Sequence, residues 1–405
     1  MKSVILFIID GLGDLPTPKT PLQVAKKPNI DYLAKNGATG LMSTISLGVT
    51  PGSDVSHLQI FGYEPKKYYP GRGPLEALGV GLQLNDGDVA FRANFATVKA
   101  NQVVDRRAGR ITTQDARKLE NIINMRIDDV QVIFKSSVEH RGALVLRGPG
   151  LSPNISDTDS HKIGELPKCV PTDSSMEAKK TSEIINKFTE LVYQKLSTHE
   201  LNKDRELPAN MIVLRSAGSF RKIPSISEKF GIKSACVAGG ALYKGVSKYI
   251  GMNVIEVSGA SGDANTNLKA KALAAIEASK ANEFVFLHVK AVDSFGHDGD
   301  FKKKTKMLER IDRELVSELV KHVKKNNKDD QCFVIITGDH STPCIRKAHS
   351  GHEVPILIFG QSERKDEVKK FDEISCAKGI LGHIKGSDVM NIVLNLTEKG
   401  KMYGS

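Results

Sequence analysis

Long apolar runs are absent from this chain of 405 residues. No segment approaches the roughly 18 consecutive apolar residues that identify a membrane-spanning helix. The apolar run at the N-terminus is only about as long as a strand, and it leads into Asp10 without the small-residue cleavage site of a signal peptide. We therefore expect a soluble protein without a membrane partner.

Cysteine is scarce as well. The five cysteines are far apart, odd in number and without a CxxC pair. This pattern argues against a disulfide framework and for a reducing compartment, so we expect a cytoplasmic location.

Several binding signatures are missing. The net charge of +11 comes mainly from lysine, in stretches such as Lys302 to Lys304 that we interpret as a solvated face. No helix-turn-helix signature, zinc-finger spacing or aromatic-basic RNA motif accompanies it, so we do not expect nucleic-acid binding. The chain also lacks a GxxxxGKS/T loop and a kinase glycine loop, which argues against a nucleotide site. A basic balance does suit a small anionic substrate.

Three short apolar segments each lead into an acidic residue. Residues 3–9 run into Asp10, residues 284–289 lead to Asp293, and residues 332–336 lead to Asp339. Such runs are typical of strands buried on both faces of a parallel sheet, and ligands bind beyond the carboxyl ends of these strands. One Asp after a strand is usually a turn residue, but three with nearby histidines should converge on one crevice.

The sequence pattern changes after about Gly62. Strand-like patterns at 88–98, 130–134 and 143–146, a helix capped by Thr113 and another at 175–196 predict a separate α+β unit. Buried-strand character returns at 211–214, and strands and helices then alternate. We predict a doubly wound, mostly parallel α/β domain, residues 1–62 and 208–405, that is split by a smaller α+β insertion, residues 63–207.

The residues near these strand ends suit two metal ions. Asp293 and His297 are four residues apart, and His349 could complete an N/O site with an open position. Asp339 and His340 are adjacent and, with Asp10, could hold a second ion. Two cations about 3.5–4 Å apart can clamp the attacking and leaving oxygens of a phosphoryl displacement. The candidate metal ligands are Asp10, Ser53, Asp293, His297, Asp339, His340 and His349.

Ser53 is the candidate nucleophile. A hydroxyl bound to a dication loses its proton easily, and the turn at Gly52 can present it. The alternative interpretation is a helix N-cap ahead of residues 55–60.

Long segments of the chain resemble the cofactor-independent phosphoglycerate mutases, in particular their archaeal-type branch within the alkaline phosphatase superfamily. They include FIIDGLGD, TPGSDVSHLQIFGY, HVKAVDSFGHDGD and TGDHSTPC, and they cover nearly the whole chain in order. The resemblance implies an alkaline-phosphatase-like fold and interconversion of 3-phosphoglycerate and 2-phosphoglycerate in glycolysis or gluconeogenesis. It also implies a phosphoserine intermediate at Ser53 without 2,3-bisphosphoglycerate.

The resemblance divides the metal ligands into two sets. Asp10, Ser53, Asp339 and His340 would bind one ion, and Asp293, His297 and His349 the other. The family pattern selects His349 over His352 as the last ligand. Mn²⁺ is the first expectation for both ions, although Mg²⁺, Co²⁺ and Zn²⁺ also accept such sites.

The resemblance also gives the insertion a role as a lid that binds substrate and excludes water. Arginine suits bidentate capture of carboxylate and phosphate, and lysine can neutralise phosphoryl oxygens. The candidate substrate residues are Arg92, Arg107, Arg110, Arg141, His161, Lys244 and Lys290.

Other functions remain open at this stage. A related metal-dependent phosphatase or a small-alcohol phosphotransferase, such as a homoserine-kinase-like enzyme, could use the same scaffold. A non-catalytic metal-binding or nucleic-acid-binding protein is a further alternative. The sequence does not indicate the oligomeric state.

Overall fold

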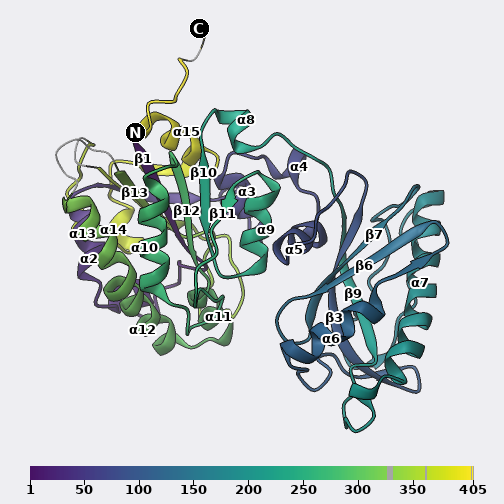
Figure 1. Cartoon of the computed structure of the whole chain (residues 1–405). Helices are drawn as coiled ribbons and strands as arrows, with labels where there is room; N and C mark the ends of the chain where they lie inside the picture. The colour runs from purple at the N-terminus through teal and green to yellow at the C-terminus, as the bar shows by residue number, and fades with distance from the viewer. Residues whose placement is uncertain (326–331, 361–362, 403, 405) are drawn as a thin grey trace. The chain divides into compact units, whose positions relative to one another are not determined.

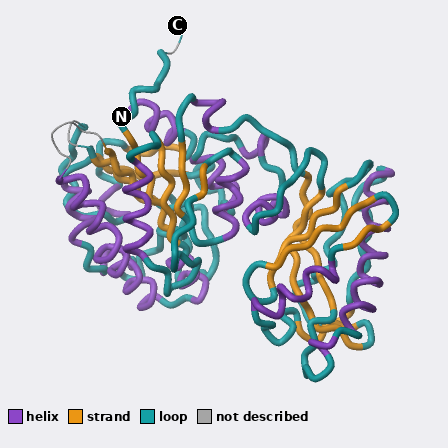
Figure 2. Tube along the Cα trace, viewed as in Figure 1, coloured by secondary structure: helices purple, strands orange, loops and turns teal. Residues whose placement is uncertain are grey.

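The computed structural model describes residues 1–325, 332–360, 363–402 and 404. The chain forms two compact units, which are seen in Figures 1 and 2. The first unit combines Met1–Tyr69 with Pro224–Ser405, and the second unit is Pro70–Ile223. None of the helices in the described ranges has the length and apolar run that a membrane crossing requires.

The sheet of the first unit has the strand order β11-β10-β12-β1-β13-β14-β2-β15. Neighbours are parallel from β11 to β13, whereas β14 is antiparallel to β13 and β2. All residues of β1 and β12 are buried, as expected for strands covered on both faces. The strands are β1 (Ser3–Ile9), β2 (Ala38–Ser43), β10 (Ser234–Val237), β11 (Asn253–Val254), β12 (Phe284–Val289), β13 (Cys332–Thr337), β14 (Val354–Phe359) and β15 (Gly382–Lys385).

Helices alternate with these strands along the chain. They are α1 (Pro21–Val24), α2 (Pro28–Lys35), α3 (Ser53–Ile60), α4 (Pro65–Tyr68), α8 (Ile226–Phe230), α9 (Ala241–Tyr249), α10 (Leu268–Ser279), α11 (Ala291–Asp298), α12 (Phe301–Ile311), α13 (Ser317–Lys325), α14 (Glu373–Cys376) and α15 (Asp388–Leu396). A π-helical turn, Asp312–Val316, joins α12 to α13.

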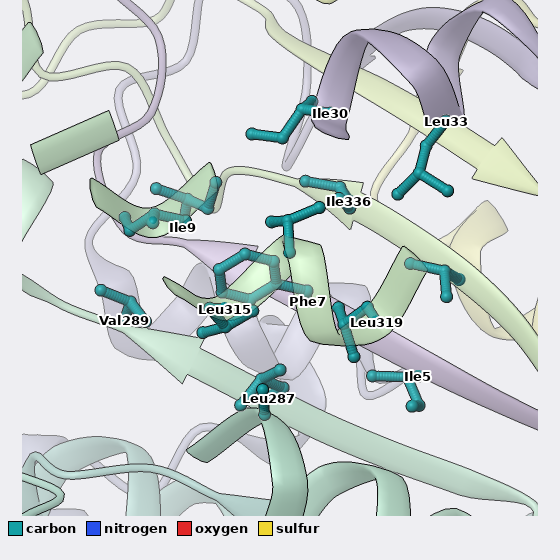
Figure 3. Packing of buried hydrophobic residues seen from close by; sticks show 14 of the residues in the cluster. Ile5, Phe7, Ile9, Ile30, Leu33, Leu287, Val289, Leu315, Leu319 and Ile336 are labelled. Carbon is teal, nitrogen blue, oxygen red and sulfur yellow. The ribbon is translucent and has the colours of Figure 1, made fainter. Parts of the chain in front are cut away.

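The alternation of side chains along the strands divides the core between the two faces of the sheet. Figure 3 shows Phe7 of β1 packed near Leu315 of the π-helical turn and Leu319 of α13. On the opposite face, Phe61 packs edge to face against Phe286, at ring centroids 4.9 Å apart. Helices therefore cover both faces, and the prediction of a doubly wound, mostly parallel α/β fold is confirmed.

The second unit is built on antiparallel pairing, with strand order β5-β6-β7-β3-β4-β8 and β9 paired to β3. Helices α6 and α7 bury their apolar stripes in its core, which is separate from that of the first unit. Its elements are α5 (Arg72–Gly79), β3 (Val89–Lys99), β4 (Gln102–Asp105), α6 (Thr113–Ile123), β5 (Met125–Ile127), β6 (Val130–Ser136), β7 (Arg141–Arg147), β8 (Gly164–Glu165), α7 (Met176–Ser197), the 3-10 turn Glu200–Asn202 and β9 (Met211–Ser219).

Three expectations were wrong. Strand β9 pairs with β3 and belongs to the second unit, because a buried apolar run does not reveal which sheet it joins. The cap of α6 is Thr112, one residue earlier than expected. Lys304 is fully buried, because the helical repeat places it on the core side of α12, away from the solvated face that we inferred for the lysine run.

Candidate metal centre and active site

Side chains at the carboxyl ends of β1 and β13 lie together. Asp10 directly follows β1, and Asp339 and His340 follow β13, which is the parallel neighbour of β1. One ligand atom from each of these three residues lies within 4.8 Å of the other two. His340 Nε2 is 3.5 Å from Asp10 Oδ1 and 3.2 Å from Asp339 Oδ2. The crevice expected at this edge of the sheet therefore contains a compact ligand group.

Each carboxylate of this group has one oxygen without a hydrogen-bond partner. Tyr243 donates its hydroxyl proton to Asp10 Oδ2, and the amides of Gly11 and His340 donate to Asp339 Oδ1, each at 3.1 Å. Asp10 Oδ1 and Asp339 Oδ2 are buried without a partner. Buried polar atoms are normally satisfied, so this pair of oxygens beside an imidazole nitrogen fits a cation.

Ser53 is the first residue of α3, and the cap position belongs to Gly52. The interpretation of Ser53 as a helix N-cap is therefore wrong. Its Oγ lies 3.1 Å from His340 Nε2, and its carbonyl accepts a hydrogen bond of 2.6 Å from His57 Nδ1. The hydroxyl is thus held at the edge of the ligand group.

A second potential ligand group consists of Asp293, His340 and His349, so that His340 belongs to both groups. Asp293 lies in α11, directly after β12, which is the other parallel neighbour of β1. Asp293 Oδ1 is 3.4 Å from Nε2 of His349 and 3.4 Å from Nε2 of His297. The rings of His340 and His349 stack with centroids 3.6 Å apart. The two groups are therefore contiguous.

Two of these histidines are oriented by main-chain carbonyls. Nδ1 of His349 donates to the carbonyl of Pro51 at 2.9 Å, and Nδ1 of His297 donates to that of Lys347 at 3.1 Å. A proton fixed on Nδ1 leaves the Nε2 lone pair of a neutral ring directed at Asp293. Two acceptors that face each other in this way suit a metal ion between them.

Burial and neighbouring charges shift the pKa values of Asp10, Asp339 and His340. Burial acts to raise the pKa of Asp10, but Lys290 and His288 hold it well below its usual value. Burial and the nearby Asp10 raise the pKa of Asp339 well above its usual value. Burial also lowers the pKa of His340 to about 3, although Asp10 opposes the shift. The imidazole is consequently neutral near pH 7 and its nitrogen remains available as a ligand.

Lys290 lies between the two ligand groups. Its Nζ is 2.5 Å from Asp293 Oδ2 and 3.4 Å from Asp10 Oδ2. Burial acts to lower the pKa of Lys290, but Asp10 and Asp293 raise it, so the ammonium stays charged. Lys244, by contrast, pairs with the exposed Glu256 at 2.6 Å. Of the two predicted lysines, Lys290 contacts candidate ligands, whereas Lys244 pairs with Glu256.

His352 has a different environment from His349. Its Nδ1 forms a hydrogen bond of 2.9 Å with Ser350 Oγ. His349, in contrast, directs Nε2 toward Asp293. The geometry therefore favours His349 as the ligand.

Sequence reasoning missed three residues that support the centre. Tyr243 bonds Asp10 and stacks on His288 with ring centroids 3.6 Å apart, while His288 Nε2 is 3.2 Å from Asp10 Oδ2. Thr342 bonds both Asp293 and His340. A histidine inside the apolar run of β12 was a signal that we did not use, whereas nothing in the local pattern marks Tyr243.

The arginines of the second unit gather on neighbouring strands. Arg92 of β3 is directly opposite Arg215 of β9, and like charges in such a pair destabilise a sheet. Burial lowers the pKa of Arg92 to about 10; Glu76 opposes this shift, while Arg72, Arg215 and Arg141 add to it. Clustered cations that lack enough acidic partners are typical of an anion-binding surface.

The remaining predicted residues of the second unit lie in other charged surroundings. Arg107 and Arg110, with Arg141, help to depress the pKa of His140, which burial lowers to about 4. His161 adopts a left-handed φ of 59° and lies against Arg106, whose Nη2 is 3.3 Å from its Nδ1. Arg106 in turn forms a two-pronged ion pair with Asp159.

Comparisons with known proteins place these features in a family. Residues 34–202 match the family model described as 2,3-bisphosphoglycerate-independent phosphoglycerate mutase. The protein of that name, form 1, from Methanocaldococcus jannaschii is 50% identical, over 99% of this chain and 98% of its own. The chain belongs to this family.

Solved structures agree with this assignment to the phosphoglycerate mutase family. The cofactor-independent phosphoglycerate mutase from Thermoplasma acidophilum is 37% identical with a TM-score of 0.72, and the match covers 98% of this chain and all of that one. A Pyrococcus horikoshii protein is 35% identical with a TM-score of 0.86, over 100% and 99% of the two chains. The resemblance recognised in the sequence is confirmed, and with it the enzyme class, an isomerase.

Proposed function

We propose that this chain interconverts 3-phosphoglycerate and 2-phosphoglycerate through a phosphoserine at Ser53, without 2,3-bisphosphoglycerate. The observation that carries the proposal is the position of Ser53 Oγ, 3.1 Å from His340 Nε2 and beside a carboxylate pair with unsatisfied oxygens. Membership of the family supports the substrate and the reaction class. We also propose that the enzyme acts in glycolysis in the cytoplasm, where its cysteines are reduced.

Two divalent metal ions complete the proposed site. Asp10, Ser53, Asp339 and His340 would hold one, and Asp293, His297 and His349 the other. The donor set of carboxylate oxygens, imidazole nitrogens and a hydroxyl fits Mn²⁺, which we propose for both positions. When bound, such ions lower the pKa of the serine hydroxyl and neutralise phosphoryl oxygens.

The side chains of the first unit then carry out the transfer. Ser53 Oγ attacks phosphorus and loses its proton, the bond from phosphorus to the C3 oxygen of the substrate breaks, and that oxygen gains one proton to become a hydroxyl of glycerate. The C2 hydroxyl of the reoriented glycerate subsequently takes the phosphoryl group back and returns the proton. Lys290 and Lys244 would balance phosphoryl charge, and the N-terminus of α3 favours an anion on Ser53.

We assign substrate capture to the second unit. Arg92, Arg107, Arg110 and Arg141 would bind the carboxylate and phosphate of the substrate, and His161 is the remaining candidate contact. Bidentate pairing with guanidinium holds such planar and tetrahedral anions in a fixed orientation. A unit that closes over bound glycerate would also keep water from the phosphoserine.

The Ser53→Ala variant tests this function. Formation of 2-phosphoglycerate from 3-phosphoglycerate is measured without bisphosphate, after chelation and addition of a single metal. We expect turnover to fall on the order of 10⁴-fold or more, as for other nucleophile deletions, with an unchanged circular dichroism spectrum. The matched control is Ser56→Ala, on the same helix and also buried.

Near-normal turnover by the Ser53→Ala variant would exclude the nucleophile. Activity of the natural chain that depended on added bisphosphate would exclude the proposed reaction. For the metal centre, we expect mutase activity to be lost after chelation and to be restored when Mn²⁺ is added back.

A further inference from the structure

Thr342 uses all of its polar atoms within the metal centre. It is fully buried, and its Oγ1 lies 2.7 Å from Asp293 Oδ1 and 3.0 Å from His340 Nδ1. Its amide donates to the carbonyl of Gly13 at 3.0 Å, and its carbonyl accepts from Lys304 Nζ at 2.9 Å. A side chain held in this way has one orientation.

The single hydroxyl proton of Thr342 decides the state of His340. Asp293 Oδ1 accepts this proton at 2.7 Å, because a carboxylate oxygen can only accept. Oγ1 must then act as an acceptor toward His340, so the imidazole proton lies on Nδ1. The Nε2 lone pair is consequently directed toward Ser53, Asp10 and Asp339.

His340 is oriented differently from the other two candidate histidine ligands. His297 and His349 donate Nδ1–H to main-chain carbonyls, which a substitution cannot remove. In the described residues, the recorded acceptor for His340 Nδ1 is the Thr342 side chain. His340 is also the residue shared by the two ligand groups. The orientation of both groups therefore depends on one hydroxyl.

A buried ion pair fixes the segment that carries Thr342. Lys304 Nζ is 2.9 Å from Asp14 Oδ2, and both side chains are almost completely inaccessible to solvent. Lys304 also donates a hydrogen bond to the carbonyl of Thr342, while Asp14 accepts one from the amide of Cys344 at 3.1 Å. Both ends of residues 342–344 are thus anchored to the sheet and to α12.

We propose that Thr342 is a positioning residue that holds His340 as the Nδ1–H tautomer and ties it to Asp293. The two ligand groups then form with compatible geometry before any metal binds. This inference rests on the proposed function only for the identity of the ligands. Without the hydroxyl, the proton of His340 would shift to Nε2, because Asp10 Oδ1 and Asp339 Oδ2 lie 3.5 Å and 3.2 Å from Nε2 and can accept it.

The test compares Thr342→Val with Thr342→Ser in the full chain freed of metal. Nitrogen-15 NMR of labelled histidine reads the tautomer of His340, whose signals are assigned by their loss in a His340→Gln variant. We expect Nδ1–H in the natural chain and in Thr342→Ser, and Nε2–H in Thr342→Val. Thr397→Val is the control, because it removes another buried hydroxyl of the first unit.

Calorimetric titration with Mn²⁺ gives a second readout. Loss of a group that orients a metal ligand commonly weakens metal binding roughly 10- to 100-fold, and we expect this loss in Thr342→Val and recovery in Thr342→Ser. An Nδ1–H tautomer with unchanged Mn²⁺ affinity in Thr342→Val would overturn the inference. If the Thr342→Val variant misfolds, the tautomer of His340 in the natural chain is the test. An Nε2–H tautomer in the natural chain would also overturn the inference.

Both measurements use resting protein without phosphoglycerate. An absence of mutase activity in the natural chain would therefore contradict the proposed function but not the role of Thr342. Conversely, an unchanged tautomer would contradict the role of Thr342 in a fully active enzyme.

Discussion

The first unit gathers carboxylates and neutral imidazoles beyond the ends of buried parallel strands, whereas the second unit gathers arginines along an antiparallel sheet. In the first, Asp10 and Asp339 are completely buried and each leaves one oxygen unsatisfied. In the second, Arg92 and Arg215 are partly exposed and lie opposite each other. The candidate ligand group of the first unit thus has unsatisfied carboxylate oxygens, whereas the second unit places two guanidinium groups side by side.

The difference lies in how each site is held. Hydrogen bonds from Tyr243, Thr342 and main-chain groups hold the candidate ligands of the first unit, an arrangement that would suit a metal ion. The arginines of the second unit share acidic partners: Arg92 lies 3.4 Å from Glu76, and Arg106 and Arg215 both pair with Asp159. Under the proposed function, the candidate ligands would hold the metal ions and the arginines would bind the anionic substrate as it turns between two transfers.

The largest expected difference between the two units is the loss of stability when an ion pair is broken. Lys304→Met should destabilise the chain by about 3–5 kcal/mol in urea unfolding, because it leaves Asp14 charged and unpaired in the interior. Lys187→Met, which breaks an exposed pair with Asp128 in the second unit, should leave the midpoint unchanged within error. Equal effects of the two substitutions would contradict the contrast in burial.

An intermediate effect should come from the arginine cluster. Arg92→Met should raise the KM for 3-phosphoglycerate roughly 10- to 100-fold, which is the size expected for losing one or more charged hydrogen bonds. Mn²⁺ affinity should not change, since the metal ligands belong to the first unit. Steady-state kinetics and calorimetry check the two parts, and Arg126→Met, on the exposed side of β5, is the control. A change in Mn²⁺ affinity without a change in KM would reverse the assignment.

The smallest effect concerns acid stability of the second unit. His140 has a pKa lowered to about 4 by burial and by Arg141 and Arg107. A folded-state pKa below the unfolded value of 6.5 means that stability is present above pH 6.5 and is lost as the pH falls toward 4. His140→Gln should therefore reduce the fall in Tm between pH 7 and pH 5 by about 2–4 °C. His383→Gln, at an exposed histidine, serves as the control. If the Tm of the His140→Gln variant fell as much as that of the natural chain between pH 7 and pH 5, His140 would not contribute to the acid response.

Much of the first unit could be predicted from the sequence. Strands β1, β12 and β13 have continuous apolar runs that end in acidic residues, and parallel strands necessarily bring such ends to one edge. The arrangement of Asp10, Asp293 and Asp339 follows from that rule. The second unit was harder, because antiparallel pairing depends on partners distant in sequence, and β9 was accordingly placed in the wrong domain.

The sequence by itself determined the alternation of strands and helices, the set of possible metal ligands and the family. Periodicity and motif spacing are local, so they survive without coordinates. Only the tertiary structure decided that Tyr243 bonds Asp10, that Thr342 bonds Asp293 and His340, that Lys304 is buried, and that His340 belongs to both candidate groups. Tyr243 and Asp10 are 233 residues apart and Lys304 and Thr342 are 38 apart, so local patterns do not reveal these contacts. The direction of a hydroxyl proton likewise has no signature in a linear chain.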